Sequence, residues 1–307
     1  MAIGISPTVD FAFKLMLGNP RHSRVTIHFL NAILSDQAAI TQVEFLNPFL
    51  EKDSDDDKLA ILDILATDEQ GRLLNIEMQT SPPVELSQRL AYYASSLYVS
   101  QLTEGARYTG LRPAISICVL TRAMFPQVPS LHLDFRLREK DGQILTSDLQ
   151  IHLLELSKLQ VDARNVYHAT AAERWAYFLR HAERLTEVEI RRLFPDPEIV
   201  EAAGVLEMIS KTPTQRMLYD ARLKLLRDEE SRLRGARQEG LQEGLEQGLE
   251  KGLQQGLEKG VIVGRILLLQ EWLRIRQWTE DEFGHCSIPQ LKALEEQLLR
   301  ELCAGES

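Results

Sequence analysis

Two apolar stretches separated by a short polar turn constrain this chain more than any other feature. Residues 58–67 read Lys-Leu-Ala-Ile-Leu-Asp-Ile-Leu-Ala-Thr and residues 73–79 read Leu-Leu-Asn-Ile-Glu-Met-Gln. Apolar runs of this length on either side of a glycine-containing turn predict a β-hairpin. A three-residue loop at 69–71 would put Gly71 at the left-handed position that such loops require.

This loop fixes which residues of the two strands face each other. It pairs Asp68 with Arg72 and, counting back, Asp63 with Glu77. Directly opposed residues share a face of the sheet, with Cβ atoms about 5 Å apart, and Gln79 joins that face two residues further on. Asp63 is the only charge between Leu59 and Thr67, and Glu77 is the only one between Leu73 and Gln79. Two carboxylates at this spacing are costly unless a cation compensates them.

The two acids leave two interpretations open. A Mg²⁺ ion would supply the compensation, because it takes oxygen ligands at about 2.0–2.1 Å, usually one or two carboxylates with water and a substrate phosphate. Alternatively, the pair shares a proton or faces solvent at an end of the sheet.

The surrounding sequence predicts helices and strands in a defined order. We expect a helix over 9–17 capped by Thr8, a helix over 23–34, a strand over 41–50, a helix over 84–101 and a strand over 113–120. The last strand is continuously apolar, which favours burial on both faces. A second hairpin is expected between 132 and 159, around 140–143, and the pattern is helical from 169 onward.

Several motifs together resemble a known family. The residues Asp63, Glu77, Met78 and Gln79 resemble the Asp…Glu-x-Lys core of the PD-(D/E)XK nuclease superfamily. Further motifs follow in a familiar order at 10–14, 29–34, 89–93, 105–108 and 155–158. Over roughly residues 6–165 the chain resembles the recombination-promoting nuclease / putative transposase family of bacteria. This resemblance implies an α/β fold: a restriction-endonuclease-like core, which is a mixed sheet flanked by helices, with an α-helical C-terminal extension.

The resemblance also implies roles for individual residues. Asp63 and Glu77 would hold Mg²⁺ or Mn²⁺, with the Met78 carbonyl and Asp10 of the first helix as further ligands. Gln79 stands where the superfamily has a lysine, so it can orient water or a phosphoryl oxygen but brings no positive charge.

Three further residues are candidates for contact with the substrate. They are Arg89, Tyr93 and Lys14, because Arg and Lys bind phosphate and Tyr can stack or hydrogen-bond. The residues alone allow plainer roles. Lys14 and Asp10 lie one helical turn apart and could form a surface ion pair, and Arg89 could pair with Glu85 on a packed aromatic helix.

Composition limits the partners and the compartment. Cys118, Cys286 and Cys303 stand far apart, which fits a reducing cytosol. Residues 1–4 lack the start of a secretory signal, and the apolar segment 261–273 is too short and too interrupted to span a bilayer. We therefore expect a soluble cytoplasmic protein. The net charge of −10 counts against tight DNA binding, because DNA affinity comes mainly from Lys and Arg.

The tail contains the one true repeat. Glycines recur every four residues from Gly240 to Gly264, and leucines follow the first five of them. Four residues advance a helix by about 400°, so the stripe drifts by about 40° per repeat and winds around the helix in the right-handed sense. Each glycine costs roughly 1 kcal/mol relative to alanine, which close approach to a partner could offset. We expect a self-association helix, with a pliable connector as the alternative, followed by two amphipathic helices that can pack together.

These observations predict four parts: a nuclease domain at 1–165, a helical extension at 166–235, the repeat at 236–264, and C-terminal helices at 265–307. The predicted function is a divalent-metal-dependent DNA endonuclease in recombination or mobile-element processes. The alternatives are a weak or inactive nuclease fold that binds nucleic acid or protein and self-associates through its tail, and a self-assembling scaffold.

Overall fold

The computed structural model describes residues 1–47, 64–80, 83–102, 104–105 and 107–305. The chain forms two compact units, Met1–Asp228 and Glu229–Ser307, each with its own apolar core. The boundary between them falls within one helix, α7 (Pro213–Trp272). The four-part division of the sequence stays a prediction.

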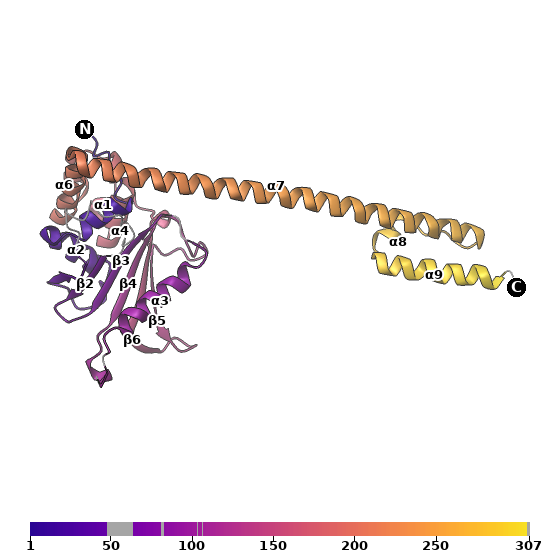
Figure 1. The fold of residues 1–307 in the computed structure, drawn as a ribbon, viewed down its shortest axis with the longest axis horizontal. Helices are drawn as coiled ribbons and strands as arrows, with labels where there is room; N and C mark the ends of the chain where they lie inside the picture. Colours follow the sequence, from indigo (N-terminus) through magenta and orange to yellow (C-terminus); the bar gives the residue numbers. More distant parts are fainter. Residues whose placement is uncertain (48–63, 81–82, 103, 106, 306–307) are drawn as a thin grey trace. The chain divides into compact units, whose positions relative to one another are not determined.

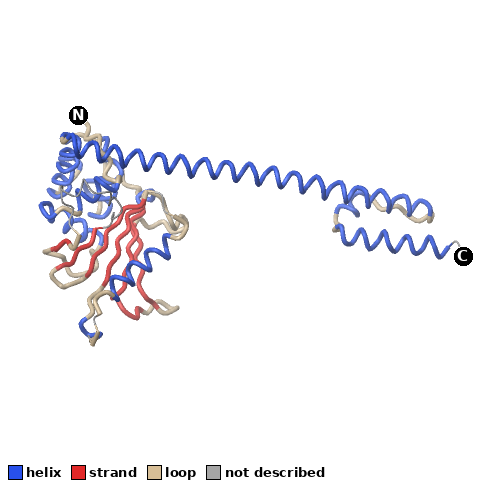
Figure 2. Tube along the Cα trace, viewed as in Figure 1, coloured by secondary structure: helices blue, strands red, loops and turns tan. Residues whose placement is uncertain are grey.

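The first unit is built on a six-stranded mixed sheet (Figures 1 and 2). The strands are β1 (Val43–Phe45), β2 (Ile64–Asp68), β3 (Leu73–Gln79), β4 (Ala114–Leu120), β5 (His132–Arg138) and β6 (Ile144–Glu155). Their order in the sheet is β1-β2-β3-β4-β6-β5. Strands β3, β4 and β6 run parallel to one another, and β1–β2–β3 and β5–β6 are antiparallel. The carboxyl ends of β3, β4 and β6 therefore lie along one edge.

The hairpin of β2 and β3 has the predicted register. Ile64 lies opposite Ile76 and Thr67 opposite Leu73. Gly71 has a φ of +75°, as the three-residue loop requires. The residue that this register pairs with Glu77, Asp63, lies outside the described residues, as do residues 48–50 of the predicted first strand.

Helices cover both faces of the sheet. The larger core receives α1 (Asp10–Leu17), α2 (Ser23–Ile33), α4 (Ala171–His181), α5 (Glu187–Leu193) and α6 (Pro197–Lys211). The opposite face packs against α3 (Leu86–Val99). Short 3-10 helices lie at Pro20–His22, Tyr108–Gly110, Leu156–Lys158, Val166–His168 and Ala182–Arg184. All seven residues of β4 are buried, which confirms the strand predicted to be covered on both sides.

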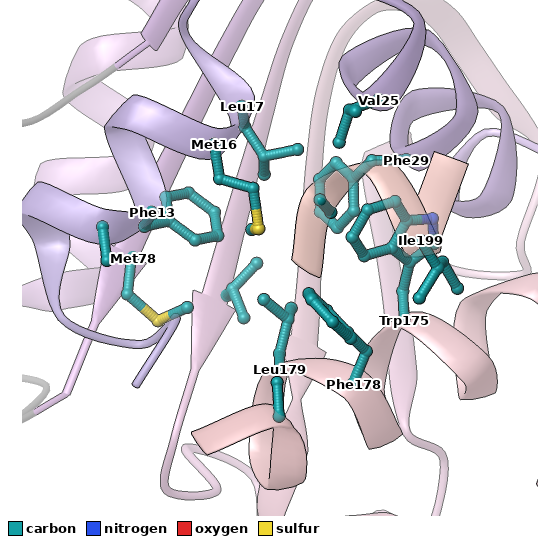
Figure 3. Close-up of a cluster of buried hydrophobic side chains, with 14 of the residues drawn as sticks. Phe13, Met16, Leu17, Val25, Phe29, Met78, Trp175, Phe178, Leu179 and Ile199 are labelled. Carbon is teal, nitrogen blue, oxygen red and sulfur yellow. The ribbon is translucent and has the colours of Figure 1, made fainter. Parts of the chain in front are cut away.

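The helices after β6 belong to the same core as the first two helices (Figure 3). Trp175 of α4 is fully buried, and its ring meets Phe29 of α2 and Phe178 edge-on at 5.5 and 5.7 Å. Its indole N–H donates to His28 Nδ1 at 3.0 Å. Because a buried aromatic side chain removes about 150–250 Å² from water, this contact ties the two halves of the unit together.

Helix α1 differs from its prediction at its first residue. The N-cap is Val9, and its side chain makes no capping bond. Thr8, predicted to be the cap, bonds Ser6 through their hydroxyl groups instead. The Asp10 carboxylate accepts the Phe11 backbone N–H at 2.7 Å and so satisfies a donor of the first turn.

The end of α1 lies close to strand β2. A Cβ on Gly18 would stand 2.8 Å from the Lys14 carbonyl oxygen and 3.1 Å from Ile64 Cγ1. Glycine therefore permits the close approach of the helix end to the first described residue of β2.

The second unit is a helical hairpin. Ile262 and Ile266 of α7 pack against Phe283 of α8 (Glu280–Gly284) and Leu291 and Leu298 of α9 (Ile288–Gly305). This packing agrees with the amphipathic patterns of the sequence. Within the described ranges, no helix is long and apolar enough to cross a membrane.

Candidate active site

The candidate site starts from a carboxylate buried in the middle of the sheet. Glu77 lies on β3 opposite Cys118 of β4, and only 1% of it is exposed. The Gln79 side-chain N–H donates to Glu77 Oε2 at 3.1 Å. Strand alternation places both side chains on the α3 face, whereas the side chain of Met78 packs in the larger core. The structure thus brings together two of the predicted catalytic residues.

The polar groups of this face suit a hard divalent cation. Asn75, two residues before Glu77, donates from Nδ2 to Ser116 Oγ at 3.5 Å. Its buried Oδ1 has no hydrogen-bond partner within the described part of the chain. Buried acceptors of this kind are rare and call for a water or an ion. The side-chain atoms available as metal ligands on this face are oxygens, which Mg²⁺ and Mn²⁺ prefer. The residues present therefore fit such an ion.

Helix α3 carries Arg89 and Tyr93 toward the same side. The Tyr98 hydroxyl donates to Asp148 of β6 at 3.0 Å, which fixes one flank of the helix above β6. At about 100° per residue, Arg89 and Tyr93 lie on the other flank, nearer β3. The Arg89 guanidinium stands over the Tyr93 ring at 5.7 Å from its centre. Neither an Arg89–Glu85 ion pair nor any other ion pair of Arg89 occurs among the described residues.

Asp10 has a partner that its sequence context did not predict. Asp10 is 8% exposed, and its carboxylate forms an ion pair with Arg222 of α7. Lys14 is half-buried on α1, whose apolar side faces the larger core. Among the residues that the structure describes, no group of three His, Cys, Asp or Glu side chains could hold a metal. The ligand set of Asp63, Glu77, the Met78 carbonyl and Asp10 therefore stays a prediction.

A buried ion pair at the end of β6 was also missed as a site feature. Glu155 is fully buried, and its Oε1 accepts the backbone N–H groups of Met124 and Phe125 at 2.8 and 3.1 Å. Its other oxygen pairs with Lys158. Glu155 lies beside Leu120 of β4, which lies beside Gln79 of β3, so the three residues form one row across the sheet. In the sequence, the spacing of three residues between Glu155 and Lys158 is the feature that could have indicated this ion pair.

A mixed sheet of this order, with a buried acid on its central hairpin, defines a restriction-endonuclease-like core. The family model described as "PD-(D/E)XK nuclease family transposase" matches residues 7–236. The chain therefore belongs to this family, and the match continues past residue 165 into α7. A search of curated proteins and a search of solved structures gave no match.

Proposed function

We propose that the chain is a divalent-metal-dependent DNA endonuclease that hydrolyses phosphodiester bonds in the cytoplasm, in recombination or mobile-element processes. The observation that supports this most directly is the carboxylate of Glu77, buried at 1% exposure and hydrogen-bonded by Gln79, in a chain of this family. A carboxylate oxygen is the kind of ligand that a hard divalent cation prefers, and a metal site is what the family implies.

Each residue has a role in this proposal. Asp63 and Glu77 hold Mg²⁺ or Mn²⁺, with the Met78 carbonyl as a further ligand. Asp10 joins this set by giving up its ion pair with Arg222. A bound divalent ion supplies polarisation of the scissile phosphate and a lowered pKa for an attacking water. Gln79, fixed on Glu77, orients that water or a phosphoryl oxygen.

The substrate is held by residues outside the ligand set. Arg89, Tyr93 and Lys14 contact the DNA backbone. Arg89 can bind a phosphate through two parallel N–H groups, while Tyr93 supports its guanidinium from below.

Hydrolysis of supercoiled plasmid with Mg²⁺ or Mn²⁺ tests the activity. Asp63→Ala and Glu77→Gln should abolish cleavage, and Gln79→Ala should slow it. Glu44→Gln, which changes an exposed carboxylate on β1, should cleave as the parent does. If Asp63→Ala cleaves as fast as the parent, Asp63 has no part in the mechanism.

Two observations favour a second candidate, a non-catalytic nuclease fold that binds nucleic acid or protein. Gln79 supplies no positive charge, and the chain carries a net charge of −10. Calorimetric titration with Mg²⁺ separates the candidates. The endonuclease gives a binding heat that Asp63→Ala removes, whereas the non-catalytic fold gives neither the heat nor cleavage.

We also propose that the tail joins copies of the chain. Leu241, Leu245, Leu249, Leu253 and Leu257 of α7 are 66–71% exposed. A Cβ added at any of the repeat glycines would meet nothing within 4 Å, so alanine fits there in the single chain.

Alanine substitution therefore separates an interface from a connector. Alanine at Gly244, Gly248 and Gly252 should stabilise an isolated helix by roughly 1 kcal/mol per site. If backbones approach closely in an oligomer, the same change should lower the number of chains per particle, measured by light scattering, to that of a chain truncated before Gly240. An unchanged mass would favour a connector.

A further inference from the structure

The loop after β4 is tied to the end of β3. The Thr121 backbone N–H donates to the Gln79 carbonyl at 3.2 Å, and the Thr121 hydroxyl donates to the Thr80 carbonyl at 2.8 Å. The first residue of this loop therefore has a fixed position beside the strand end that carries Gln79 and Glu77.

The same loop is fixed a second time from β6. Glu155, held by Lys158, accepts the backbone N–H groups of Met124 and Phe125 with one carboxylate oxygen. Hydrogen bonds to a charged acceptor are roughly twice as strong as neutral ones, and this acceptor is fully buried. Residues 121–125 are consequently anchored at both ends.

Between these two anchors stands an exposed arginine, Arg122. We propose that Arg122 is a phosphate-binding residue of the site at Glu77, and that it supplies the positive charge that Gln79 lacks. The inference rests on the proposed function, because it names a further contact between that site and DNA. Glu155 acts as a positioning residue, since it touches the loop rather than the substrate.

The position of Arg122 and the chemistry of its side chain favour this assignment. Arg122 lies on the edge where the carboxyl ends of β3, β4 and β6 meet, one residue beyond the Thr121 anchor. A guanidinium binds a phosphate with two parallel N–H groups and keeps its charge at any relevant pH.

The chain offers a matched control at the other end of the same strand. Arg112 precedes β4 by two residues, as Arg122 follows it by two, and it is also exposed. Its backbone N–H is held by Gln101 at 2.9 Å, so its loop is also fixed. At about 3.3 Å per residue the two arginines stand on opposite edges of the sheet, which only one of them shares with Gln79.

The experiment measures binding of a fluorescent DNA duplex to the full chain in Ca²⁺ as a function of salt. The slope of log K against log salt is negative, and each lost phosphate contact reduces its magnitude by about 0.9. Arg122→Gln should reduce the magnitude by about that amount, Arg122→Lys should retain most of it, and Arg112→Gln should leave it unchanged. In the parent, Glu155→Gln should also reduce the magnitude of the slope. In the Arg122→Gln variant, Glu155→Gln should reduce it no further. A purely structural role of Glu155 would not produce this difference.

The outcomes separate this inference from the proposed function. A parent that cleaves DNA, with Arg122→Gln binding at an unchanged slope, overturns the phosphate site and leaves the nuclease intact. A parent that does not cleave, with the magnitude of the slope reduced only in Arg122→Gln, supports the phosphate site and contradicts the nuclease. Equal losses in Arg112→Gln and Arg122→Gln, or no DNA binding by the parent, also overturn the phosphate site.

Discussion

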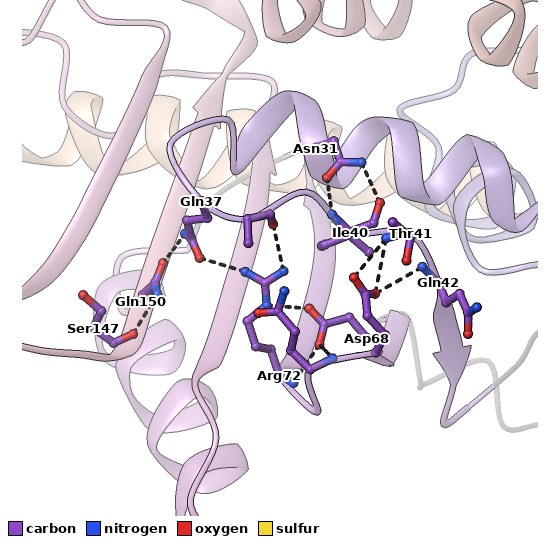
Figure 4. Close-up of polar contacts among 12 residues, drawn as sticks. Asn31, Gln37, Ile40, Thr41, Gln42, Asp68, Arg72, Ser147 and Gln150 are labelled. Atoms are coloured by element: carbon purple, nitrogen blue, oxygen red, sulfur yellow. Dashed lines mark hydrogen bonds and ion pairs between the residues drawn. The ribbon is translucent and has the colours of Figure 1, made fainter.

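The buried ion pair of Asp68 and Arg72 closes the β2–β3 hairpin, and we expect its loss to lower the free energy of unfolding substantially. The Asp68 side chain is fully buried and that of Arg72 is 6% exposed, with Nε and Oδ2 2.5 Å apart. The same guanidinium donates to Gln37 Oε1 at 3.1 Å and to the Ala38 carbonyl at 3.3 Å (Figure 4). Arg72→Met keeps an apolar stem of similar length and removes these three contacts.

The size of this loss in stability follows from the contacts that the Asp68 carboxylate keeps in Arg72→Met. Removing one partner of a buried pair costs about 3–5 kcal/mol, because the other charge stays buried without compensation. Asp68 Oδ1 keeps the backbone N–H groups of Gln70 and Arg72, both at 2.9 Å, but Oδ2 loses the guanidinium. We therefore expect Arg72→Met to lower the free energy of unfolding by about 3 kcal/mol, the lower end of that range.

Urea unfolding followed by tryptophan fluorescence measures this change. Trp175 is the only tryptophan of the first unit, while Trp272 and Trp278 belong to the second. With Phe at the latter two positions, the signal reports the first unit alone.

Two comparisons decide whether the reasoning holds. Asp68→Asn combined with Arg72→Met should cost less than the sum of the single changes by at least about 1 kcal/mol, because each single change leaves one buried charge without its partner and the double change leaves none. Arg164→Met, which breaks an exposed pair with Asp162, should produce no resolvable change. A loss below about 1 kcal/mol for Arg72→Met would refute the argument, since exposed pairs contribute that little.

Three further predictions concern stability. Gly18→Ala should cost about 1–3 kcal/mol in urea unfolding, because its Cβ would crowd a backbone oxygen and Ile64; an unchanged midpoint would show that the helix end yields easily. Burial lowers the pKa of His152 from 6.5 to about 4, so the unfolded state takes up its proton first and stability should fall as pH drops through that interval. His152→Gln should flatten this part of the stability–pH curve, and an unaltered curve would contradict the assignment. Thr170→Ala removes the capping box with Glu173 and should lower the melting temperature, at a cost of about 1 kcal/mol; no shift would mean that packing alone holds α4.

The sequence predicts the hairpin well because its physical rules are local. A glycine turn and an alternation of two residues determine the register, and Ile64 indeed lies opposite Ile76. The same rules put Glu77 and Gln79 on one face. The buried strand β4 could also be predicted, since an unbroken apolar run of this length is typical of a strand that is covered on both faces.

The rest depends on contacts that no local pattern specifies. Asp10 pairs with Arg222, 212 positions away, and nothing near either residue selects the other. The cap of α1 was assigned to Thr8 because hydroxyls are good caps, yet Asp10 competes for the same turn. The pattern of an amphipathic helix indicates which side is buried but not which element packs against that side. The packing of α4 on α2 through Trp175 could therefore not be predicted from the sequence.

Contacts between the two ends of the first unit bear on its synthesis. Ser6 donates its backbone N–H to the Tyr219 hydroxyl, and the amide of Ile3 bonds the carbonyl of Leu185. A ribosome makes residues 3–10 early and their partners late, so the nascent sheet stays without the cover of α4, α5 and α6 until these helices emerge. Such exposed apolar surface favours aggregation and chaperone binding. Expression of the first half alone should therefore yield insoluble protein.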